Sequence, residues 1–553
     1  MKKNKAVIRK SIFIPMSIIF VTVILTGIIA PEAFYNGENA IVGFAFENFG
    51  WLFQISGGIF VALCIFLLFS KYGNIRFGGK DAKPNFSNWN WFAITLTAGI
   101  ATGILFWGIA EPITHFMNPP KVLGIDPGTE AAAIFAMRTS FVHWTFIPYA
   151  MYSIAGIGIA YAVYNMKLPY QVSSVLYPIF GKKIKGAVGS VVDNLCLFAM
   201  AGAVAAILGV GTMQIGSGIN ILTGIKTGKS LWLIIIVSIV VTYIAFSYTG
   251  VSKGVRWLAD KNSKIFIIIM LFVFIFGPTA FILNLGTQSA GDFIQNFFTS
   301  TSFTSPINGS DWPRWWPIYY WAIWLAYAPL EGLFFTMLCK GRTIREFLIV
   351  NLVLPSAFGL VWFSVFGGAA IHLELNGAKL WSTIQDKGLE VSLFAFMQNF
   401  PLAKFMCWLI IFTIIISIVT LCDSMTATIA SLSTTTNNNS NFEAPGYLKI
   451  FWGVVMASMA IVNILSSGGK ISGIDSTKQI ATVAGFPILF LMLLMAYCTI
   501  TMLVKNEKYD LAYYPDTAHI DEEVVVKNEE DEKDIEVMNE EDAVVKNDDT
   551  LKM

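Results

Sequence analysis

The chain has 553 residues, of which 55% are hydrophobic and only 13% are charged. A soluble protein with this balance would lack the polar surface that it needs in water, so soluble enzymes and nucleic-acid-binding proteins are excluded. Apolar runs of about 20 residues, the length that crosses a ~30 Å hydrocarbon layer, recur along the whole sequence. We therefore predict an all-α membrane protein that crosses a lipid bilayer many times.

Twelve apolar segments have the length of a transmembrane helix. They cover residues 12–30, 50–70, 90–113, 139–164, 190–222, 230–249, 263–285, 315–339, 345–370, 403–434, 448–467 and 482–504. Lys and Arg gather in alternate loops, at 71–83, 167–185, 253–264 and 340–345. The loop 31–49 has neither. Because these residues favour the cytoplasmic side, we expect both termini to be cytoplasmic.

The end of the chain is strongly acidic. From Lys505 onward, 17 acidic residues stand against 6 lysines, with little apolar material to bury. Such a composition favours disorder in water. We interpret residues 505–553 as a solvated tail, with a regulatory role as the alternative.

The cysteines and histidines do not form a catalytic or metal-binding motif. The six cysteines lie in or beside apolar runs without a CxxC pair, and the four histidines show no HExxH spacing. We therefore predict no metal site, no cofactor and no membrane enzyme.

The segment 90–113 contains Gly99 and Gly103 beside Thr97. Glycines can interrupt a transmembrane helix and free backbone carbonyls for a substrate or an ion. The same spacing also suits close packing of two helices, and the sequence leaves both interpretations open. Ile100, between the two glycines, is a candidate substrate contact, and Thr97 is a candidate for the coupling region.

Aromatic residues recur at helical spacing in two segments. The first group is Trp144, Tyr149 and Tyr152, and the second is Trp316, Tyr320, Trp324 and Tyr327. A quaternary ammonium has no N–H to donate, but aromatic faces attract it by about 0.5–2 kcal/mol each. These residues predict an aromatic cage for such a cation. An aromatic belt at the membrane interface, with ordinary packing, is the alternative interpretation.

Glu331 lies four residues after Tyr327 in an apolar segment. A carboxylate at the centre of a bilayer costs about 3 kcal/mol on insertion scales, and such residues are usually functional. We predict that Glu331 pairs with the substrate ammonium or takes up a proton. A structural charge pair is the alternative.

Several motifs together resemble the betaine/choline/carnitine transporter family. They are FWGIAEP (106–112), HWTFIPYAMY (143–152), FGPTAFILN (276–284), KGRTIREF (340–347) and VWFSVFGG (361–368). The resemblance covers residues 50 to 505. It implies a leucine-transporter-like fold with two inverted five-helix repeats, alternating access, a homotrimer and a bacterial inner membrane. One cage tryptophan of the family is replaced by Ile323.

This resemblance divides the chain into six parts. They are a cytoplasmic N-terminus (1–11), two peripheral helices (12–89), the first repeat (90–285), an extracellular connector (286–314), the second repeat (315–504) and the acidic tail (505–553). The substrate implied by the resemblance is a betaine, carnitine, γ-butyrobetaine or choline.

The expected sodium ligands of the family are incomplete. Sodium-driven members carry a Thr-Ser pair where this chain has Thr420 and Leu421, and the segment AMAGAVAAILGVG (199–211) lacks their threonines. Sodium requires several oxygen ligands, as other hard cations do. This pattern is similar to the sodium-independent carnitine/γ-butyrobetaine exchanger.

Two differences from that exchanger remain. Its arginine is replaced by Asn262, with Lys261 and Lys264 as neighbours that could substitute for it, and its methionine is replaced by Glu331. We predict Na⁺-independent substrate exchange, with Na⁺- or H⁺-coupled symport as the alternative. A sodium-coupled amino-acid symporter of the same architecture would need sodium-binding hydroxyls that this sequence lacks. An ion channel would need a filter loop or a ring of like charges, and the sequence shows neither.

Overall fold

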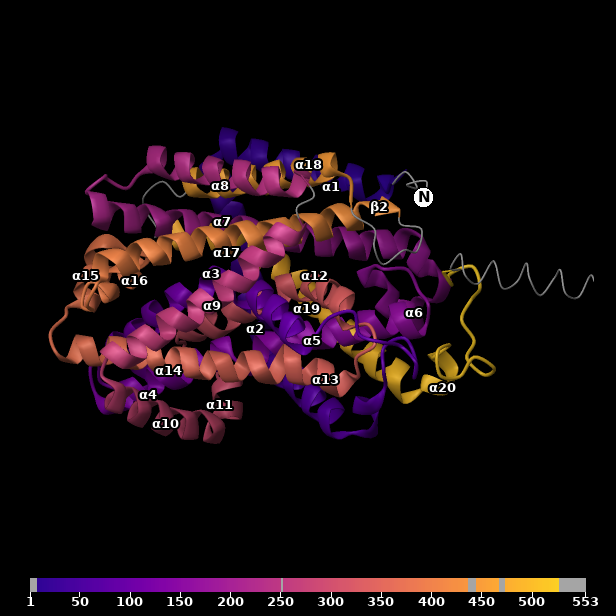
Figure 1. Cartoon of the computed structure of the whole chain (residues 1–553), viewed down its shortest axis with the longest axis horizontal. Helices are drawn as coiled ribbons and strands as arrows, with labels where there is room; N and C mark the ends of the chain where they lie inside the picture. The colour runs from indigo at the N-terminus through magenta and orange to yellow at the C-terminus, as the bar shows by residue number, and fades with distance from the viewer. Residues whose placement is uncertain (1–6, 250–251, 436–443, 467–472, 527–553) are drawn as a thin grey trace, which may run out of the picture.

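The computed structural model describes residues 7–249, 252–435, 444–466 and 473–526, and these are mostly helical (Figure 1). The long helices are α1 (Lys10–Ile29), α2 (Pro31–Phe69), α3 (Asn88–Met117), α4 (Glu130–Trp144), α5 (Phe146–Ala160), α7 (Ala187–Thr223), α8 (Lys229–Thr249), α9 (Ser252–Phe276), α10 (Thr279–Gln295), α12 (Tyr319–Cys339), α14 (Leu354–Leu375), α17 (Ala403–Leu432), α18 (Gly446–Ser466) and α19 (Gly473–Val504).

Shorter elements connect or extend these helices. The short α-helices are α6 (Tyr177–Phe180), α11 (Phe297–Thr301), α13 (Ile344–Leu348), α15 (Leu380–Lys387), α16 (Ser392–Met397) and α20 (Asn506–Tyr509). The 3₁₀ and π turns are η1 (Lys71–Asn74), η2 (Lys121–Leu123), η3 (Tyr161–Asn165), η4 (Val172–Leu176), η5 (Gly181–Lys185), η6 (Arg314–Ile318), η7 (Ile349–Val353) and η8 (Leu389–Val391). Two short strands, β1 (Val7–Ile8) and β2 (Thr434–Thr435), pair antiparallel.

The helices identify a multi-pass membrane protein. Within the described ranges, nine helices are long and apolar enough to cross a bilayer, or ten if the bent pair α9–α10 counts as one span. Within the described residues, each segment predicted from the sequence lies mainly on helix, with breaks in two of them. The number of crossings, the inverted repeats and the predicted domain boundaries stay predictions.

The first predicted loop, 31–49, is helical, so that prediction is wrong. α2 begins at Pro31, directly after α1 ends, and continues to Phe69. Proline suits the first helical position because it needs no hydrogen-bond partner for its nitrogen. Glu32 adds a negative charge in the first turn, where the helix dipole favours it.

Two helices predicted as continuous are broken. The segment 263–285 bends by 109° between Phe276 and Thr279, where Gly277 and Pro278 separate α9 from α10. Proline removes a backbone donor and clashes with the preceding turn, which ends a helix there. The segment 139–164 is interrupted at Thr145, whose backbone angles are φ −117° and ψ −113°.

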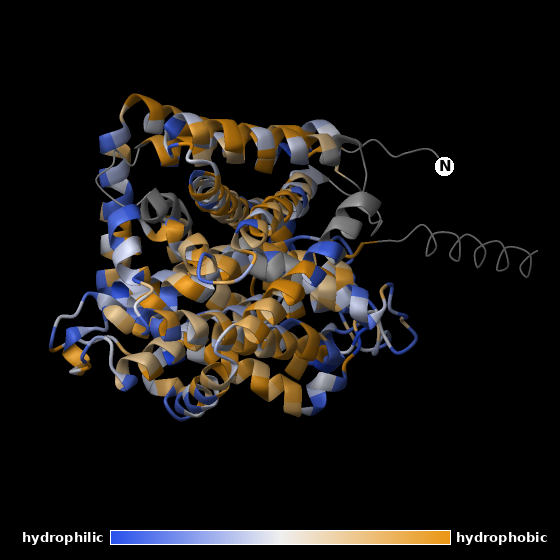
Figure 2. Ribbon diagram, turned by 60° about the vertical axis from the view of Figure 1, so that its left-hand side comes forward, coloured by the Kyte–Doolittle hydropathy of each residue, from blue (hydrophilic) through white to orange (hydrophobic). Residues whose placement is uncertain are grey.

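The molecule has a buried centre and an apolar outer layer. α12 packs against α5 and α19, and α19 also packs against α7. On one side α1, α8 and α18 form an outer layer over α7 and α17, and α4, α10 and α14 lie on the other side (Figure 1). The outer helices are largely hydrophobic (Figure 2). For example, α1 exposes Ile14, Ile18, Val21 and Leu25, as a lipid-facing helix does.

Part of the tail that we expected to be disordered is structured. Residues 505–526 pack beside η3 and η5, where the Asp510 carboxylate accepts a hydrogen bond from Asn165 Nδ2 at 3.0 Å. Val526 N donates to the carbonyl of Lys167 at 2.9 Å, and Tyr177 donates to the Asp521 carboxylate at 3.1 Å. The remaining part of the predicted disordered tail, 527–553, lies outside the described residues.

Candidate substrate and coupling site

Close approach of α5 and α12 places the two predicted aromatic groups together. A Cβ added at Gly332 would lie 2.6 Å from the backbone nitrogen of Gly156. Glycine at both positions therefore lets the two backbones touch, as small residues do at helix contacts in membranes. The aromatic residues on either side of this contact face one another.

Trp144, Tyr320 and Trp324 form one aromatic group, and all three are buried. The ring centroids of Trp144 and Trp324 are 5.0 Å apart, edge to face. Tyr320 stacks on Trp324 at 5.8 Å and lies 5.6 Å from Trp144. Trp316 extends the group, since its ring is 6.3 Å from Tyr320. The structure thus brings four of the predicted cage residues together.

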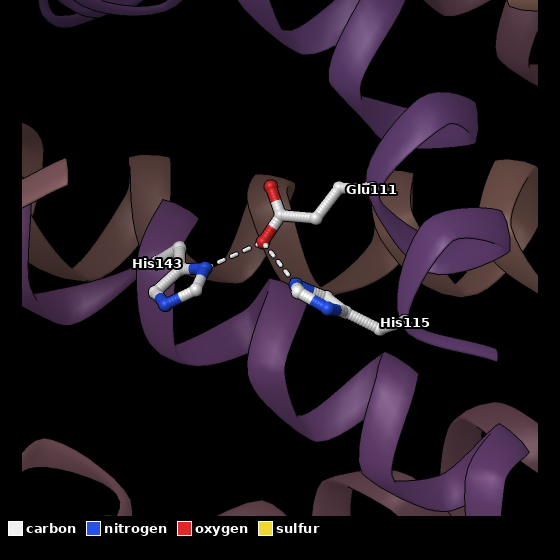
Figure 3. Close-up of side chains that lie close together, drawn as sticks. All are labelled: Glu111, His115 and His143. Atoms are coloured by element: carbon white, nitrogen blue, oxygen red, sulfur yellow. Dashed lines mark hydrogen bonds and ion pairs between the residues drawn. The ribbon is translucent and has the colours of Figure 1, made fainter. Parts of the chain in front are cut away.

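Glu111 holds this aromatic group by hydrogen bonds. Its Oε2 accepts from Trp144 Nε1 at 2.7 Å and from the Tyr320 hydroxyl at 2.8 Å. Its Oε1 lies 2.5 Å from His143 Nδ1 (Figure 3). Each donor stabilises a carboxylate that is buried among apolar helices. Glu111 therefore fixes the orientation of two cage rings from α4 and α12.

His115 completes a compact cluster with Glu111 and His143. Its Nε2 lies 3.6 Å from Glu111 Oε1, so both imidazoles approach the same carboxylate oxygen (Figure 3). All three residues are buried, and their ligand atoms lie within 4.8 Å of one another. Carboxylate and imidazole are ligand types that divalent transition metals use.

Tyr149, Tyr152, Tyr327 and Glu331 form a second buried group. The rings of Tyr149 and Tyr152 are 6.3 Å apart, and the Tyr327 hydroxyl donates to the Ala203 carbonyl of α7 at 2.5 Å. The Glu331 carboxylate lies close enough to all three tyrosines to interact with them through its charge. Its Oε1 is buried and makes no hydrogen bond to a described residue.

The break at Thr145 separates the first predicted aromatic triplet. Trp144 ends α4, whereas Tyr149 and Tyr152 lie on α5. Trp144 contacts Tyr320 and Trp324, and the two tyrosines lie near Glu331 instead. The predicted triplet is therefore divided between two neighbouring aromatic groups.

The structure favours helix packing for Gly103 of α3, whereas the surroundings of Gly99 lie outside the described residues. α3 is continuous from Asn88 to Met117. A Cβ at Gly103 would come within 2.9 Å of the Trp144 ring, so this glycine makes room for a cage residue. The side chains of Thr97 and Ile100 lie outside the described residues, and their roles stay predictions.

The predicted coupling region gathers at the contact between α9 and α17. Asn262 is buried, and its Nδ2 donates to Ser417 Oγ at 2.7 Å. The Thr420 hydroxyl lies one turn further along α17 and donates to the carbonyls of Ile416 and Ser417. Leu421 is also buried. Lys261 and Lys264 have exposed side chains.

A pocket lined by residues of α4 and α11 and of the segments beside them approaches the cluster. Its volume is about 190 Å³, and His143, Arg138, Asn296, Phe303 and Trp312 are among its lining residues. It reaches His143 and therefore lies beside the aromatic group, not at Tyr327 or Glu331. The Arg138 guanidinium in its wall is paired with Asp292 at 2.9 Å.

Sequence reasoning missed Glu111, His115 and His143 as site residues. Glu111 and His115 are four residues apart on α3, so they share a helix face. Glu111 lies inside the FWGIAEP motif and His115 follows it. Their helical spacing could have identified them as a pair of candidate site residues. His143 joins them only through the packing of α4 against α3, which no local motif reveals.

Comparisons with known proteins agree with the motifs. A family model described as BCCT, the betaine/carnitine/choline family transporter, matches residues 11–508. A probable glycine betaine transporter of Desulfitobacterium hafniense is 35% identical over 480 residues, which cover 87% of this chain and 94% of that protein. The glycine betaine transporter OpuD of Bacillus subtilis is 32% identical, with 90% and 97% covered.

A third relative is the osmo-dependent choline transporter BetT2 of Acinetobacter baylyi, which is 30% identical over 88% of this chain and 70% of its own length. The resemblance drawn from the motifs is confirmed, while the closer likeness to the carnitine exchanger stays a prediction. The chain belongs to the betaine/carnitine/choline family of transporters.

Proposed function

We propose that this transporter carries quaternary-ammonium solutes, such as betaine, choline, carnitine or γ-butyrobetaine, by alternating access. The observation that carries the proposal is the buried group of Trp144, Tyr320 and Trp324, whose orientation Glu111 sets. Rigid, desolvated ring faces recognise a methylated nitrogen without hydrogen bonds. The names of the relatives, which include glycine betaine and choline transporters, support the same class of substrate.

Two rings of the proposed cage are in direct contact. Trp144 and Trp324 touch edge to face, with their centroids 5.0 Å apart, so no space for a cation is left between these two rings. The rings must therefore separate to admit a trimethylated nitrogen. Movement of α12 against α4 and α5 provides such opening, as expected for alternating access.

Binding of the purified protein tests the proposed cage directly. Tryptophan-fluorescence titration with betaine, choline, carnitine and γ-butyrobetaine is expected to reveal at least one ligand. Trp324→Leu removes one ring face and weakens that binding about 2- to 30-fold. Trp315→Leu changes a neighbouring exposed tryptophan and leaves the affinity unchanged. No binding of any trimethylated amine would refute the proposal.

We further propose that Glu331 acts on the substrate or on a coupled proton. Its carboxylate is buried beside Tyr149, Tyr152 and Tyr327. A charge there attracts a cationic, choline-type solute more than a zwitterion, whose own carboxylate is repelled. Glu331→Gln is expected to lower affinity or to remove the pH dependence of transport. Unchanged binding and transport across pH would exclude Glu331 from the mechanism.

For the mode of transport we propose Na⁺-independent exchange of one solute for another. The Thr420 hydroxyl already donates to two backbone carbonyls, and Leu421 and the alanines of α7 offer no side-chain oxygen. A sodium site requires several oxygen ligands. Uptake into proteoliposomes with substrate inside should then proceed equally with and without Na⁺. Strict dependence on Na⁺, or on a proton gradient, would favour symport instead.

The family relation also leads us to propose a homotrimer in a bacterial inner membrane, with both termini cytoplasmic. The arginines and lysines of alternate loops support this orientation. Native mass spectrometry tests the assembly, and labelling of single cysteines introduced in the loops tests the orientation.

A further inference from the structure

The cluster of Glu111, His115 and His143 lies beside the proposed cage, and the proposed cation–π recognition uses neither of its two histidines. Contrary to our prediction of no metal site from the sequence, we infer that these three residues form a binding site for a divalent transition metal ion of the zinc type. The inference goes beyond the proposed function, and the metal-binding step does not depend on which solute is carried.

The geometry of the cluster needs little change to accept an ion. His115 Nε2 lies 3.6 Å from Glu111 Oε1, and His143 Nδ1 lies 2.5 Å from the same oxygen. Zinc ligands at about 2.0–2.2 Å in a tetrahedral arrangement lie roughly 3.3–3.5 Å from each other. The His115–Glu111 separation is therefore close to that of a metal-bound pair. The His143–Glu111 hydrogen bond would open by about 1 Å.

The ligand atoms are available for a metal. Trp144 and Tyr320 occupy Glu111 Oε2, which leaves Oε1 facing the two imidazoles (Figure 3). Neither ring nitrogen of His115 makes a hydrogen bond within the described part of the chain. A buried imidazole that makes no hydrogen bond is costly, and a metal ion would bind its free nitrogen lone pair. The donors on Oε2 would then act as the outer shell that orients a metal-bound carboxylate.

The donor set also selects the kind of ion. Two imidazole nitrogens and one carboxylate oxygen suit Zn²⁺, Co²⁺ and similar ions, whereas Na⁺, Mg²⁺ and Ca²⁺ prefer oxygen alone. An ion can approach through the pocket lined by His143, Asn296 and Trp312. Arg138 in the same pocket is paired with Asp292, so its charge is largely compensated.

Metal binding has a consequence for transport. The ion would link α3, through Glu111 and His115, to α4, through His143. Glu111 would remain bonded to Trp144 of α4 and to Tyr320 of α12, while Trp144 must separate from Trp324 of α12 to admit substrate between them. A linked cluster therefore holds the cage closed, and Zn²⁺ is expected to inhibit transport reversibly.

The test uses the full chain, purified in detergent without substrate. Titration with Co²⁺ is expected to produce visible d–d absorption bands, and calorimetry with Zn²⁺ should give one site per chain. His115→Gln should weaken the affinity at least tenfold. His372→Gln, a histidine on α14 away from the cluster, should leave it unchanged. His115→Cys supplies another metal ligand, so it should retain binding and add a thiolate-to-cobalt charge-transfer band.

The outcomes separate this inference from the proposed function. Absence of Co²⁺ bands, or equal affinity in the wild type, His115→Gln and His372→Gln, overturns the metal site. Absence of the charge-transfer band in folded His115→Cys also overturns it. Because the titration contains no solute, a protein that binds the metal but no trimethylated amine would fail only the proposed function. Zn²⁺ inhibition that EDTA reverses, absent in His115→Gln, supports the link to transport.

Discussion

At the scale of single residues, Glu111 organises the proposed binding site. One carboxylate accepts hydrogen bonds from Trp144 of α4 and Tyr320 of α12 and contacts His143. A charge buried among helices is stable only with such partners. Glu111 thereby connects the two sides of the cage, although it need not touch the substrate itself.

Replacing Glu111 with alanine should weaken substrate binding at least tenfold. The change leaves the Trp144 indole and the Tyr320 hydroxyl without their acceptor, at a cost of about 1–3 kcal/mol for each buried donor. Fluorescence titration of the purified variant measures the effect. Glu47→Ala is the control, because Glu47 is largely exposed in its ion pair with Arg314 and should bind as the wild type does. Equal affinities would contradict the positioning role of Glu111.

At the scale of helices, the contact between α5 and α12 determines which aromatic residues meet. Gly332 and Gly156 allow the two backbones to touch. The helical path breaks at Thr145 and at Gly277–Pro278, and the second break bends α10 by 109° relative to α9. Because of the first break, Trp144 joins Tyr320 and Trp324, while Tyr149 and Tyr152 join Glu331.

A methyl group at Gly332 should destabilise the protein. The new Cβ in Gly332→Ala would lie 2.6 Å from Gly156 N and 2.7 Å from Ala155 Cβ. Backbone atoms cannot move aside as a flexible side chain can, so the helices must separate, at a cost of roughly 1–3 kcal/mol. Thermal unfolding in detergent should show a lower midpoint. Gly58→Ala, whose Cβ would meet nothing within 4 Å, should keep the wild-type midpoint.

At the scale of the whole molecule, residues 505–526 connect the end of the chain to two basic loops. Asp510 binds Asn165, Tyr513 accepts a hydrogen bond from Arg76 N at 3.1 Å, and Lys182 pairs with Glu523 at 3.5 Å. Burial raises the pKa of the Asp510 carboxyl. Three donors, from Asn165, Ala512 and Tyr513, offset that cost.

Loss of Asp510 should release this segment from the membrane body. Asp510→Ala removes three hydrogen bonds, and hydrogen–deuterium exchange of residues 505–526 is expected to increase by at least tenfold. Asp516→Ala changes an exposed residue of the same segment and should exchange at the wild-type rate. If both variants exchange alike, Asp510 does not hold the segment in position.

The sequence by itself determined the class of the protein and its family. Long apolar runs dictate a helical membrane protein because backbone groups need internal hydrogen bonds in lipid, and five motifs identified the transporter family. It also supplied most aromatic residues of the candidate cage, since helical spacing places them on common faces.

Only the tertiary structure decided how those residues combine. Helical spacing could not reveal the break at Thr145, because that depends on how α4 and α5 pack against the rest of the molecule. It could not bring His143 to Glu111 and His115, which lie on another helix. The acidic composition predicted disorder from residue 505 onward. Composition does not show that a specific partner exists, such as Asn165 for Asp510. Contacts between distant segments depend on tertiary packing, which local sequence patterns do not predict.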